Sequence, residues 1–394
     1  MTMKFPVYLD NHSTTKVDPR VVEAMLPFLT EHYGNAASKQ HEFGWVAEAA
    51  VENARTEVAT LIGADAKEIV FTSGATESIN LALKGVAEAS SSEGNHVITA
   101  VTEHKAGLDA CRNLERRGFR VTYLPVDRYG MVSPDDVVHA ITEKTIMVTI
   151  MMANNEIGTI APVSEIGSLC RERRILFHTD ASQSVAKIPV NVSDLNVDLL
   201  SFSAHKMYGP KGIGALYVRT AHPRIRMAQQ IDGGGHERGL RSGTLNVPAI
   251  VGFGKAADIA RQQMTQDSER VSALRNALVE GITSRLEETW VNGHATHRLP
   301  NNANITFKHV NADQLMMDMK DIAVSSGSAC TSASAEPSHV LKAIGLDDEH
   351  VLSSLRFGLG RFTTAEEIDY ATGRIAETVK TAREKSTHYQ LIQT

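Results

Sequence analysis

Apolar runs alternate with amphipathic segments from about residue 16 to about residue 260. The runs TIMVTIMM, ILFHTD and DLLSFS are apolar at consecutive positions, which is typical of strands that are covered on both faces. Between such runs, apolar residues recur at helical spacing, for example at Val46, Ala50, Val58 and Leu61. This alternation predicts an α/β fold in which helices cover both faces of a mostly parallel sheet.

The ends of the expected helices carry their own signals. Asp18 followed by Pro19 is typical of a helix start, and Gly63 is placed to end the helix that contains Val46. The apolar stripe expected for the first of these helices comprises Met25, Leu26, Phe28 and Leu29.

The pattern changes in the C-terminal third. A long helix is predicted around Leu278, followed by short strands and by a last helix whose start has a capping-box pair, Thr363 with Glu366. This change predicts a second, smaller α+β domain, joined by the N-terminal strand and packed on the first domain. The expected large domain comprises residues 16–262, and the smaller one residues 1–15 and 263–394.

Charged residues are spread along the whole chain. There are 46 acidic and 40 basic residues, without the basic block that nucleic acids or membrane surfaces attract. No apolar run approaches the roughly 20 residues of a membrane span, and the N-terminus lacks the apolar core of a signal peptide. We therefore expect a soluble, cytoplasmic protein whose partners are small molecules or proteins.

The chain has three cysteines, an odd number without a CxxC pair, which argues against a disulfide framework and against a zinc site. Cys111 and Cys170 lie in helical patterns and are expected to be small buried residues. Cys330 lies in a stretch rich in Ser, Ala and Gly, at about residues 325–338, that is predicted to be a mobile loop. Packing explains such a cysteine poorly, so Cys330 is a candidate nucleophile.

A strand, a tight turn of small residues and a helix follow one another in IVFTSGATESINLAL. The N–H groups at the helix start, near Gly74, Ala75 and Thr76, are free to bind a phosphate. An ordinary strand-to-helix turn with Thr76 as a cap is the alternative. The absence of the pattern GxxxxGK[ST] from this segment weakens a nucleotide triphosphatase interpretation.

Two further strands end in polar residues, where ligands meet an α/β sheet. Asp180 ends the strand ILFHTD and, if buried, needs a cationic partner; the simpler alternative is a helix cap. The strand DLLSFS is followed by His205 and Lys206, in a setting that suits a Schiff-base lysine. Lys211 is an alternative, but Ser203 and His205 could hold a phosphate beside Lys206. Together these features favour a pyridoxal phosphate (PLP) site.

Arg356 alternates with apolar residues in SSLRFGLG and is expected to point away from their face. Its planar fork suits a bidentate clamp on an α-carboxylate. A surface salt bridge is the alternative.

The chain resembles the NifS/IscS group of cysteine desulfurases, within the class V aminotransferase family, over essentially its whole length. The matching segments are YLDNHSTT, YGNAASKQH, FTSGATESINLAL, TEHKA, NNEIGT, HTDASQ, SFSAHKMYGPKGIG, GGGHERGLRSGT, SSGSACTSAS and SLRFGLGRFT. The resemblance implies the type I fold of PLP-dependent transferases and a homodimer with a shared active site.

It also implies a role for individual residues. Lys206 would bind PLP as a Schiff base, Asp180 would pair with the pyridine nitrogen, and His104 would stack on the ring. Gln183 would bond the phenolic oxygen, and Asn155 would lie near that oxygen or the substrate carboxylate. From the sequence alone, a histidine at a helix start such as His104 is more often a cap, and Asn155 would ordinarily be a turn residue.

The phosphate is assigned by the resemblance to Thr76, Ser203 and His205, joined by Thr244 from a second subunit. Thr244 could also be a simple loop hydroxyl.

The reaction implied is the conversion of L-cysteine to alanine. Arg356 would fix the substrate carboxylate, Lys206 would remove the Cα proton, and Cys330 would attack the substrate sulfur and keep it as a persulfide, with His104 assisting proton transfers. The sulfur would pass to acceptor proteins, an iron–sulfur scaffold among the candidates.

Other functions stay open at this point. They are a transaminase or lyase that does not use Cys330, a PLP-retaining scaffold or regulator, and a preference for selenocysteine. The segments GNAASKQH and NHSTTK depart from the GNPSS-x-H and ATTP patterns expected in the family, which leaves their substrate-side contacts open. The C-terminus, STHYQLIQT, is shorter than in members whose tail docks an iron–sulfur scaffold, so the acceptor is open too.

Overall fold

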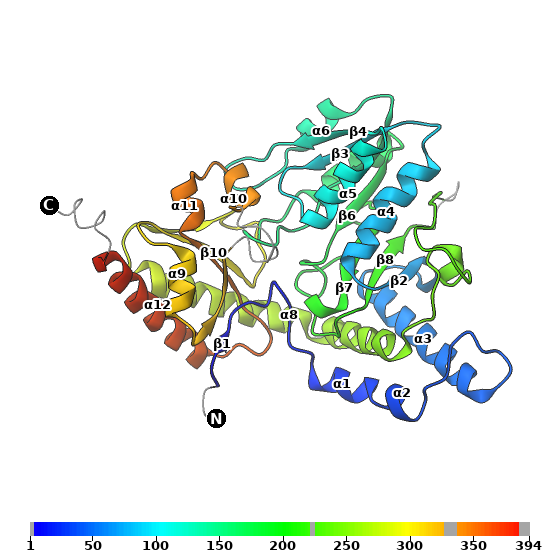
Figure 1. The fold of residues 1–394 in the computed structure, drawn as a ribbon, viewed down its shortest axis with the longest axis horizontal. Helices are drawn as coiled ribbons and strands as arrows, with labels where there is room; N and C mark the ends of the chain where they lie inside the picture. Colours follow the sequence, from blue (N-terminus) through cyan, green and yellow to red (C-terminus); the bar gives the residue numbers. More distant parts are fainter. Residues whose placement is uncertain (1–3, 221–224, 327–336, 386–394) are drawn as a thin grey trace.

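A computed structural model describes residues 4–220, 225–326 and 337–385. Its larger sheet has the strand order β2-β8-β7-β6-β5-β3-β4 (Figure 1). Strands β3 to β7 run parallel, while β8 is antiparallel to both of its neighbours, which confirms the mostly parallel sheet. The strands are β2 (Ile69–Thr72), β3 (His96–Ala100), β4 (Arg120–Leu124), β5 (Thr145–Thr149), β6 (Leu176–Asp180), β7 (Leu199–Ser203) and β8 (Gly214–Val218).

Helices cover both faces of this sheet, as predicted. Successive strand residues point to opposite faces, so Val97 packs with α4 and α5 whereas Ile98 packs with α3, α7 and α8. Helix α3 ends at Leu61, before Gly63, whose φ of +68° suits glycine at a helix exit. The helices are α3 (Glu42–Leu61), α4 (Ala75–Ala89), α5 (Lys105–Arg116), α6 (Pro134–Ala140), α7 (Val163–Glu172) and α8 (Val247–Thr283).

A smaller antiparallel sheet, in the order β12-β13-β10-β9, has its own apolar core. Strand β1 (Val7–Tyr8) pairs in parallel with β11 (Ile322–Ala323), which places the N-terminal segment beside this second unit. The sheet strands are β9 (Thr289–Asn292), β10 (Asn302–Phe307), β12 (Ser325–Ser326) and β13 (Ser354–Gly358), and the helices of this unit are α9 (Ala312–Asp318), α10 (His339–Ala343), α11 (Asp348–Leu352) and α12 (Ala365–Lys385).

Helix α8 joins the two cores. Its first half contributes Phe253 and Ala257 to the core of the large sheet, and its second half contributes Leu278 and Ile282 to the core of the small one. Figure 1 shows it running from the large sheet to α12. The boundary expected at residue 262 therefore falls inside one continuous helix.

Two local expectations were wrong. The first helix is divided into α1 (Pro19–Met25) and α2 (Pro27–Thr30), because Pro27 lacks the N–H that a continuous helix needs. Leu26 and Leu29, expected in its apolar stripe, are 50% and 59% exposed. The capping box of α12 lies one residue later than expected and consists of Thr364 with Glu367.

The N-cap of α1 is Asp18, as predicted, since its side chain accepts from Arg20 N. Within the described ranges, none of the helices combines the length and apolarity that crossing a bilayer requires.

Candidate active site

A cavity of about 500 Å³ lies where β6 and β7 end and α4 begins. Its position agrees with the rule that ligands of α/β sheets bind at the carboxyl ends of the strands. The structure brings together there most of the site residues predicted from the sequence. They are Gly74, Ala75, Thr76, His104, Asn155, Asp180, Gln183, Ser203, His205 and Lys206.

One end of the cavity is the start of α4. The helix has its N-cap at Gly74, so the N–H groups of its first turn have no partner within the helix. A Cβ on Gly214 would lie 2.6 Å from the Cα of Gly74, so glycine allows the two backbones to meet here. The positive end of this helix is suited to a phosphate.

Polar side chains from the end of β7 face the same region. Ser203 Oγ donates to Ile213 O at 3.2 Å, and His205 Nδ1 lies 3.1 Å from Thr14 Oγ1. Burial, together with the nearby Lys206, lowers the pKa of His205 to about 4. His205 is therefore a neutral hydrogen-bonding group at neutral pH.

Asp180 ends β6 and is 7% exposed. Its Oδ1 accepts from Ser182 N at 2.9 Å and from Ser182 Oγ at 2.5 Å. In the part of the chain that the structure describes, no cationic side chain forms an ion pair with it. A buried carboxylate without a cation fits a ligand that supplies one, such as the protonated pyridine of PLP.

Lys206 follows β7 in a short turn and reaches across the cavity to the N-terminal segment. Its Nζ donates to the backbone oxygens of His12 at 2.5 Å and Ser13 at 2.8 Å. The sequence left Lys211 as an alternative, and it also lines the cavity, but it is exposed. Lys206 is partly buried, which favours it over Lys211 as the reactive amine.

A second lysine lies behind Lys206 and was missed by sequence reasoning. Lys187 is buried, and its Nζ donates to Lys206 O at 2.5 Å. Burial, reinforced by the charges of Lys206 and Arg361, lowers the pKa of Lys187 to about 7. Nothing in the apolar pattern of SQSVAKIP distinguishes this lysine from an exposed one.

His104 serves both of the roles that the sequence left open. It caps α5, since its Nδ1 accepts from Ala106 N at 3.1 Å, and it also lines the cavity. Because Nδ1 is an acceptor here, the neutral ring carries its proton on Nε2.

His12 is a buried residue that hydrogen-bonds both Gln183 and Asn302, and the sequence did not predict it. Asn302 Oδ1 accepts from Arg298, so its amide nitrogen donates to His12 Nε2 at 3.1 Å. Nδ1 then carries the proton and donates to Gln183 Oε1 at 2.9 Å. Burial first, and then the charge of Arg356, hold the pKa of His12 well below its usual value. The motif NHST gives no hydrophobic pattern from which this burial could be inferred.

Gln183 is held on both sides by His12. Its Oε1 accepts from the ring, and its Nε2 donates to His12 O at 3.0 Å. One N–H of the amide therefore remains for a ligand in the cavity.

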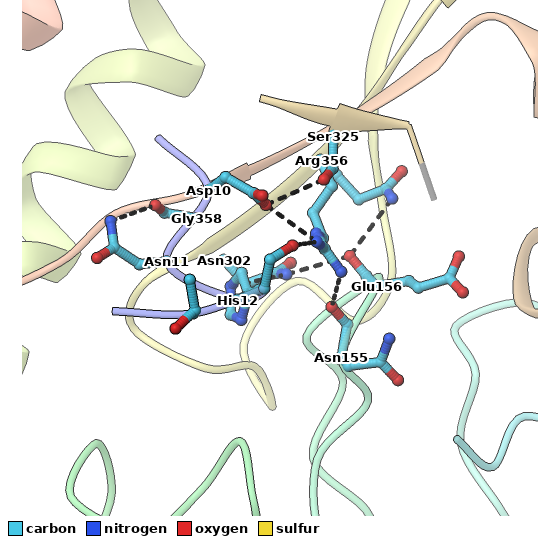
Figure 2. A network of polar contacts seen from close by, with 12 residues as sticks. Asp10, Asn11, His12, Asn155, Glu156, Asn302, Ser325, Arg356 and Gly358 are labelled. Carbon is cyan, nitrogen blue, oxygen red and sulfur yellow. Dashed lines mark hydrogen bonds and ion pairs between the residues drawn. The ribbon is translucent and has the colours of Figure 1, made fainter. Parts of the chain in front are cut away.

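Arg356 does not line the cavity, and its guanidinium group already has hydrogen-bond partners within the protein. It is 1% exposed, and its Nη2 donates to Asp10 Oδ1 at 3.0 Å and to Ser13 Oγ at 2.8 Å, while Nη1 donates to Asn155 O at 3.0 Å (Figure 2). The sequence left a surface salt bridge as the alternative. Arg356 does form a salt bridge, with Asp10, but this ion pair is largely buried and does not lie at the surface. As predicted, Leu355 and the other apolar residues of β13 face the opposite side and pack in the core.

The remaining predicted residues lie apart from this arrangement. Thr244 is exposed and does not line the cavity. Cys330 lies outside the described residues. Cys111 and Cys170 are buried in the cores, as expected, and burial raises the pKa of each thiol to about 12.

The model of the family described as aminotransferase class-V matches residues 7–371. "Cysteine desulfurase IscS" of Anaeromyxobacter sp. (strain Fw109-5) is 57% identical over 391 residues, which cover 99% of this chain and 96% of that protein. "Cysteine desulfurase, mitochondrial" of Arthroderma benhamiae is 54% identical over 98% of this chain and 77% of that protein.

Solved structures of similar fold agree with these sequence comparisons. A structure titled "NIFS-LIKE PROTEIN" matches with a TM-score of 0.89 at 39% identity, over 95% of this chain and all of that chain (100%). One titled "SspA in complex with cysteine" matches with a TM-score of 0.81 at 39% identity, over 91% of this chain and 100% of that one. The chain therefore belongs to the class-V aminotransferase family of PLP-dependent enzymes, in its NifS/IscS group of cysteine desulfurases.

Proposed function

We propose that this protein is a PLP-dependent cysteine desulfurase, which converts L-cysteine to L-alanine and holds the sulfur as a persulfide on Cys330. The observation that carries the proposal is the convergence of two side chains on a cavity at a helix N-terminus. They are the partly buried amine of Lys206 and the buried carboxylate of Asp180, which forms no ion pair with any residue that the structure describes. The names of the relatives supply the reaction.

The residues of the cavity fit the cofactor group by group. Lys206 would bind its aldehyde covalently, Asp180 would keep the ring nitrogen protonated, and His104 would lie against the ring. The bound cofactor supplies an electron sink for the bond electrons of the substrate Cα. The remaining contacts would come from Gln183 and Asn155 to the ring oxygen and from Gly74, Ala75, Thr76, Ser203 and His205 to the phosphate.

The protein's own groups would then move protons and sulfur. Lys206 Nζ, which donates to the backbone oxygens of residues 12 and 13 at the cavity, would remove the Cα proton. Arg356 would fix the substrate carboxylate together with Asn155, whose backbone oxygen accepts from Arg356 Nη1. The Cys330 thiolate attacks the substrate sulfur, the Cβ–S bond breaks as the new S–S bond forms, and Cβ gains a proton to give alanine. His104, which lines the cavity, would assist these proton transfers.

We also propose a homodimer in which Thr244 reaches the phosphate of the other subunit. Its exposed position away from its own cavity supports this arrangement. So do the large apolar side chains that are exposed between residues 26 and 45, namely Leu26, Leu29, Tyr33, Phe43 and Trp45. The same framework has a large domain at residues 16–262 and a small one at 1–15 and 263–394 that carries Cys330.

The sulfur would pass from Cys330 to acceptor proteins of iron–sulfur cluster assembly or of thiolation, in the cytoplasm. This part of the proposal is supported by the name IscS carried by the bacterial relatives.

The test is to add L-cysteine to the PLP-loaded protein and to measure alanine and protein-bound persulfide. The wild type is expected to form both, and Cys330→Ala to lose the persulfide and nearly all alanine formation. Full sulfide release by Cys330→Ala would instead identify a lyase or transaminase of the same family. A protein that binds PLP but forms no alanine would be a scaffold or regulator.

A further inference from the structure

Four side chains from parts of the chain that are far apart in sequence form a row of hydrogen bonds that ends at the cavity. Arg298 Nη2 donates to Asn302 Oδ1 at 3.3 Å, and Asn302 Nδ2 lies 3.1 Å from His12 Nε2 (Figure 2). His12 Nδ1 lies 2.9 Å from Gln183 Oε1. His12 and Gln183 line the cavity, so the row connects the start of β10, where Asn302 lies, with the candidate active site.

The first member of the row fixes the direction of every bond in it. Arginine has donors and no acceptor, so Asn302 must present its carbonyl oxygen to Arg298. The backbone oxygen of Glu156, 3.1 Å from Asn302 Nδ2, requires the same orientation of the amide. His12 Nε2 then accepts, and Nδ1 carries the only N–H of the neutral ring. Gln183 therefore presents its carbonyl oxygen to this N–H.

Two glycines make room for the middle members of the row. A Cβ on Gly158 would lie 2.6 Å from Asn302 Cγ, and a Cβ on Gly358 would lie 2.8 Å from His12 Cδ2. Asn302 is fully buried, and His12 is 1% exposed. Close packing therefore holds both side chains in place, in addition to their hydrogen bonds.

The surroundings of His12 keep its ring neutral. Arg356 on β13, Lys187 after β6 and Lys206 after β7 surround it with positive charge. Burial first, and then these charges, hold the pKa of His12 well below its usual value. A second proton, on Nε2, would also break the contact with Asn302. The row therefore keeps its direction at neutral pH.

We propose that His12 is a positioning residue, which holds the Gln183 amide so that an N–H and not the carbonyl oxygen meets the ring oxygen of bound PLP. The inference rests on the proposed function and deepens it, because that function assigns the ring oxygen to Gln183 without saying what orients the amide. Gln183 Nε2 uses one hydrogen on His12 O at 3.0 Å, so residue 12 holds both ends of the amide. A turned amide would place two oxygens together and would offer the cofactor an acceptor.

The orientation of this amide affects how tightly bound PLP holds a proton. An N–H donor stabilises the ring oxygen as an anion. It does so most after the neighbouring Schiff-base nitrogen has lost its proton, because that nitrogen then no longer donates to the same oxygen. Since the bonds of the row all run in one direction, each also strengthens the next. The row is therefore expected to lower the pH at which the Schiff base with Lys206 loses its proton.

The experiment titrates the absorbance of the PLP-loaded protein with pH, without substrate. His12→Phe fills the space of the ring but gives Gln183 Oε1 no donor, so the midpoint should rise by roughly 0.5–1 pH unit, as for the loss of one hydrogen bond. His12→Asn offers an N–H close to the position of Nδ1 and should stay near the wild type. Gln183→Leu removes the amide and should raise the midpoint at least as much as His12→Phe. Each variant keeps the backbone oxygen that accepts from Lys206 Nζ.

The double variant His12→Phe/Gln183→Leu separates an effect through Gln183 from an effect on the whole site. Its midpoint should equal that of Gln183→Leu, and additive shifts would overturn the proposal. An unchanged midpoint in His12→Phe would overturn it as well. So would an equal shift in His12→Asn, because the ring would then act through its shape and not through its N–H.

Asn302→Leu decides the matter if His12→Phe does not retain PLP. It keeps His12 and Gln183 but removes the amide that fixes the proton on Nδ1, so the midpoint should again rise. An unchanged midpoint in this variant would contradict the role of the row.

The two proposals fail separately. A wild type that forms no alanine from L-cysteine contradicts the desulfurase function, whatever the titration shows. A normal desulfurase whose titration midpoint does not depend on His12 contradicts only the role of His12.

Discussion

The two sides of the cavity are built differently. On the cofactor side, Asp180 and Ser203 are the last residues of two adjacent parallel strands, Lys206 follows the second strand, and all three line the cavity beside the start of α4. On the amino-acid side, Arg356 reaches the cavity only through residues 10–13 and Asn155. Asp180 and Ser203 are positioned by their own strands, whereas Arg356 is held by partners that lie far from it in the sequence.

The two sides also differ in how their buried charges are neutralised. The cofactor side leaves the buried carboxylate of Asp180 for a ligand to neutralise. The amino-acid side already neutralises its buried cation with Asp10. The first side is therefore expected to need its cofactor for stability, and the second to be stable without its substrate.

The largest expected effect lies on the cofactor side. Lys206→Ala removes the amine that binds the cofactor and moves the Cα proton, and general base catalysis alone contributes about 10²–10⁴-fold. Alanine formation from L-cysteine should fall by at least that factor. Lys211→Ala should lose less than tenfold, and an equal loss in the two variants would contradict the assignment of Lys206.

Asp180→Asn tests whether that carboxylate depends on the cofactor. Losing one partner of a buried charge pair costs about 3–5 kcal/mol, which is roughly 150-fold to 5,000-fold in affinity. The variant should lose PLP on dialysis under conditions in which the wild type retains it. Equal retention of PLP by both proteins would mean that Asp180 does not face the cofactor cation.

Arg356→Met tests the amino-acid side, where the buried charge is expected to be neutralised within the protein and not by a ligand. Removing the guanidinium leaves the largely buried Asp10 without its cation, and the free energy of unfolding should fall by about 3 kcal/mol. The double variant Arg356→Met/Asp10→Asn should recover about 1–3 kcal/mol relative to the sum of the single changes. Urea unfolding of the PLP-loaded proteins measures both values, and strict additivity would show that the pair is not coupled.

The smallest effect is a pH dependence from Lys187. Its pKa falls from 10.5 to about 7 on folding, so between these values the unfolded chain binds more protons than the native one. The wild type should therefore gain stability relative to Lys187→Met as the pH rises from about 7 to about 10.5, by up to about 1.4 kcal/mol for each pH unit.

Urea unfolding at pH 7, 8 and 9 measures this difference. Parallel curves for the wild type and Lys187→Met would mean that Lys187 is not buried as a neutral amine.

The same contrast explains what the sequence could predict. Strands β6 and β7 are apolar runs that end in polar residues, so the order of residues along the chain already indicates Asp180 and Lys206 as neighbours. His12 and Lys187 carry no such signal, because their burial depends on packing between elements far apart in the sequence. Leu26 and Leu29 have the periodicity of a buried stripe but are exposed, which periodicity within one helix cannot distinguish from burial.

The central claim is that Lys206 is the amine that binds PLP. Reducing the PLP-loaded protein with borohydride fixes the cofactor to its lysine, and peptide mass spectrometry then identifies the modified residue. The account predicts modification of Lys206 alone. Modification of Lys187 or Lys211 in its place would contradict it.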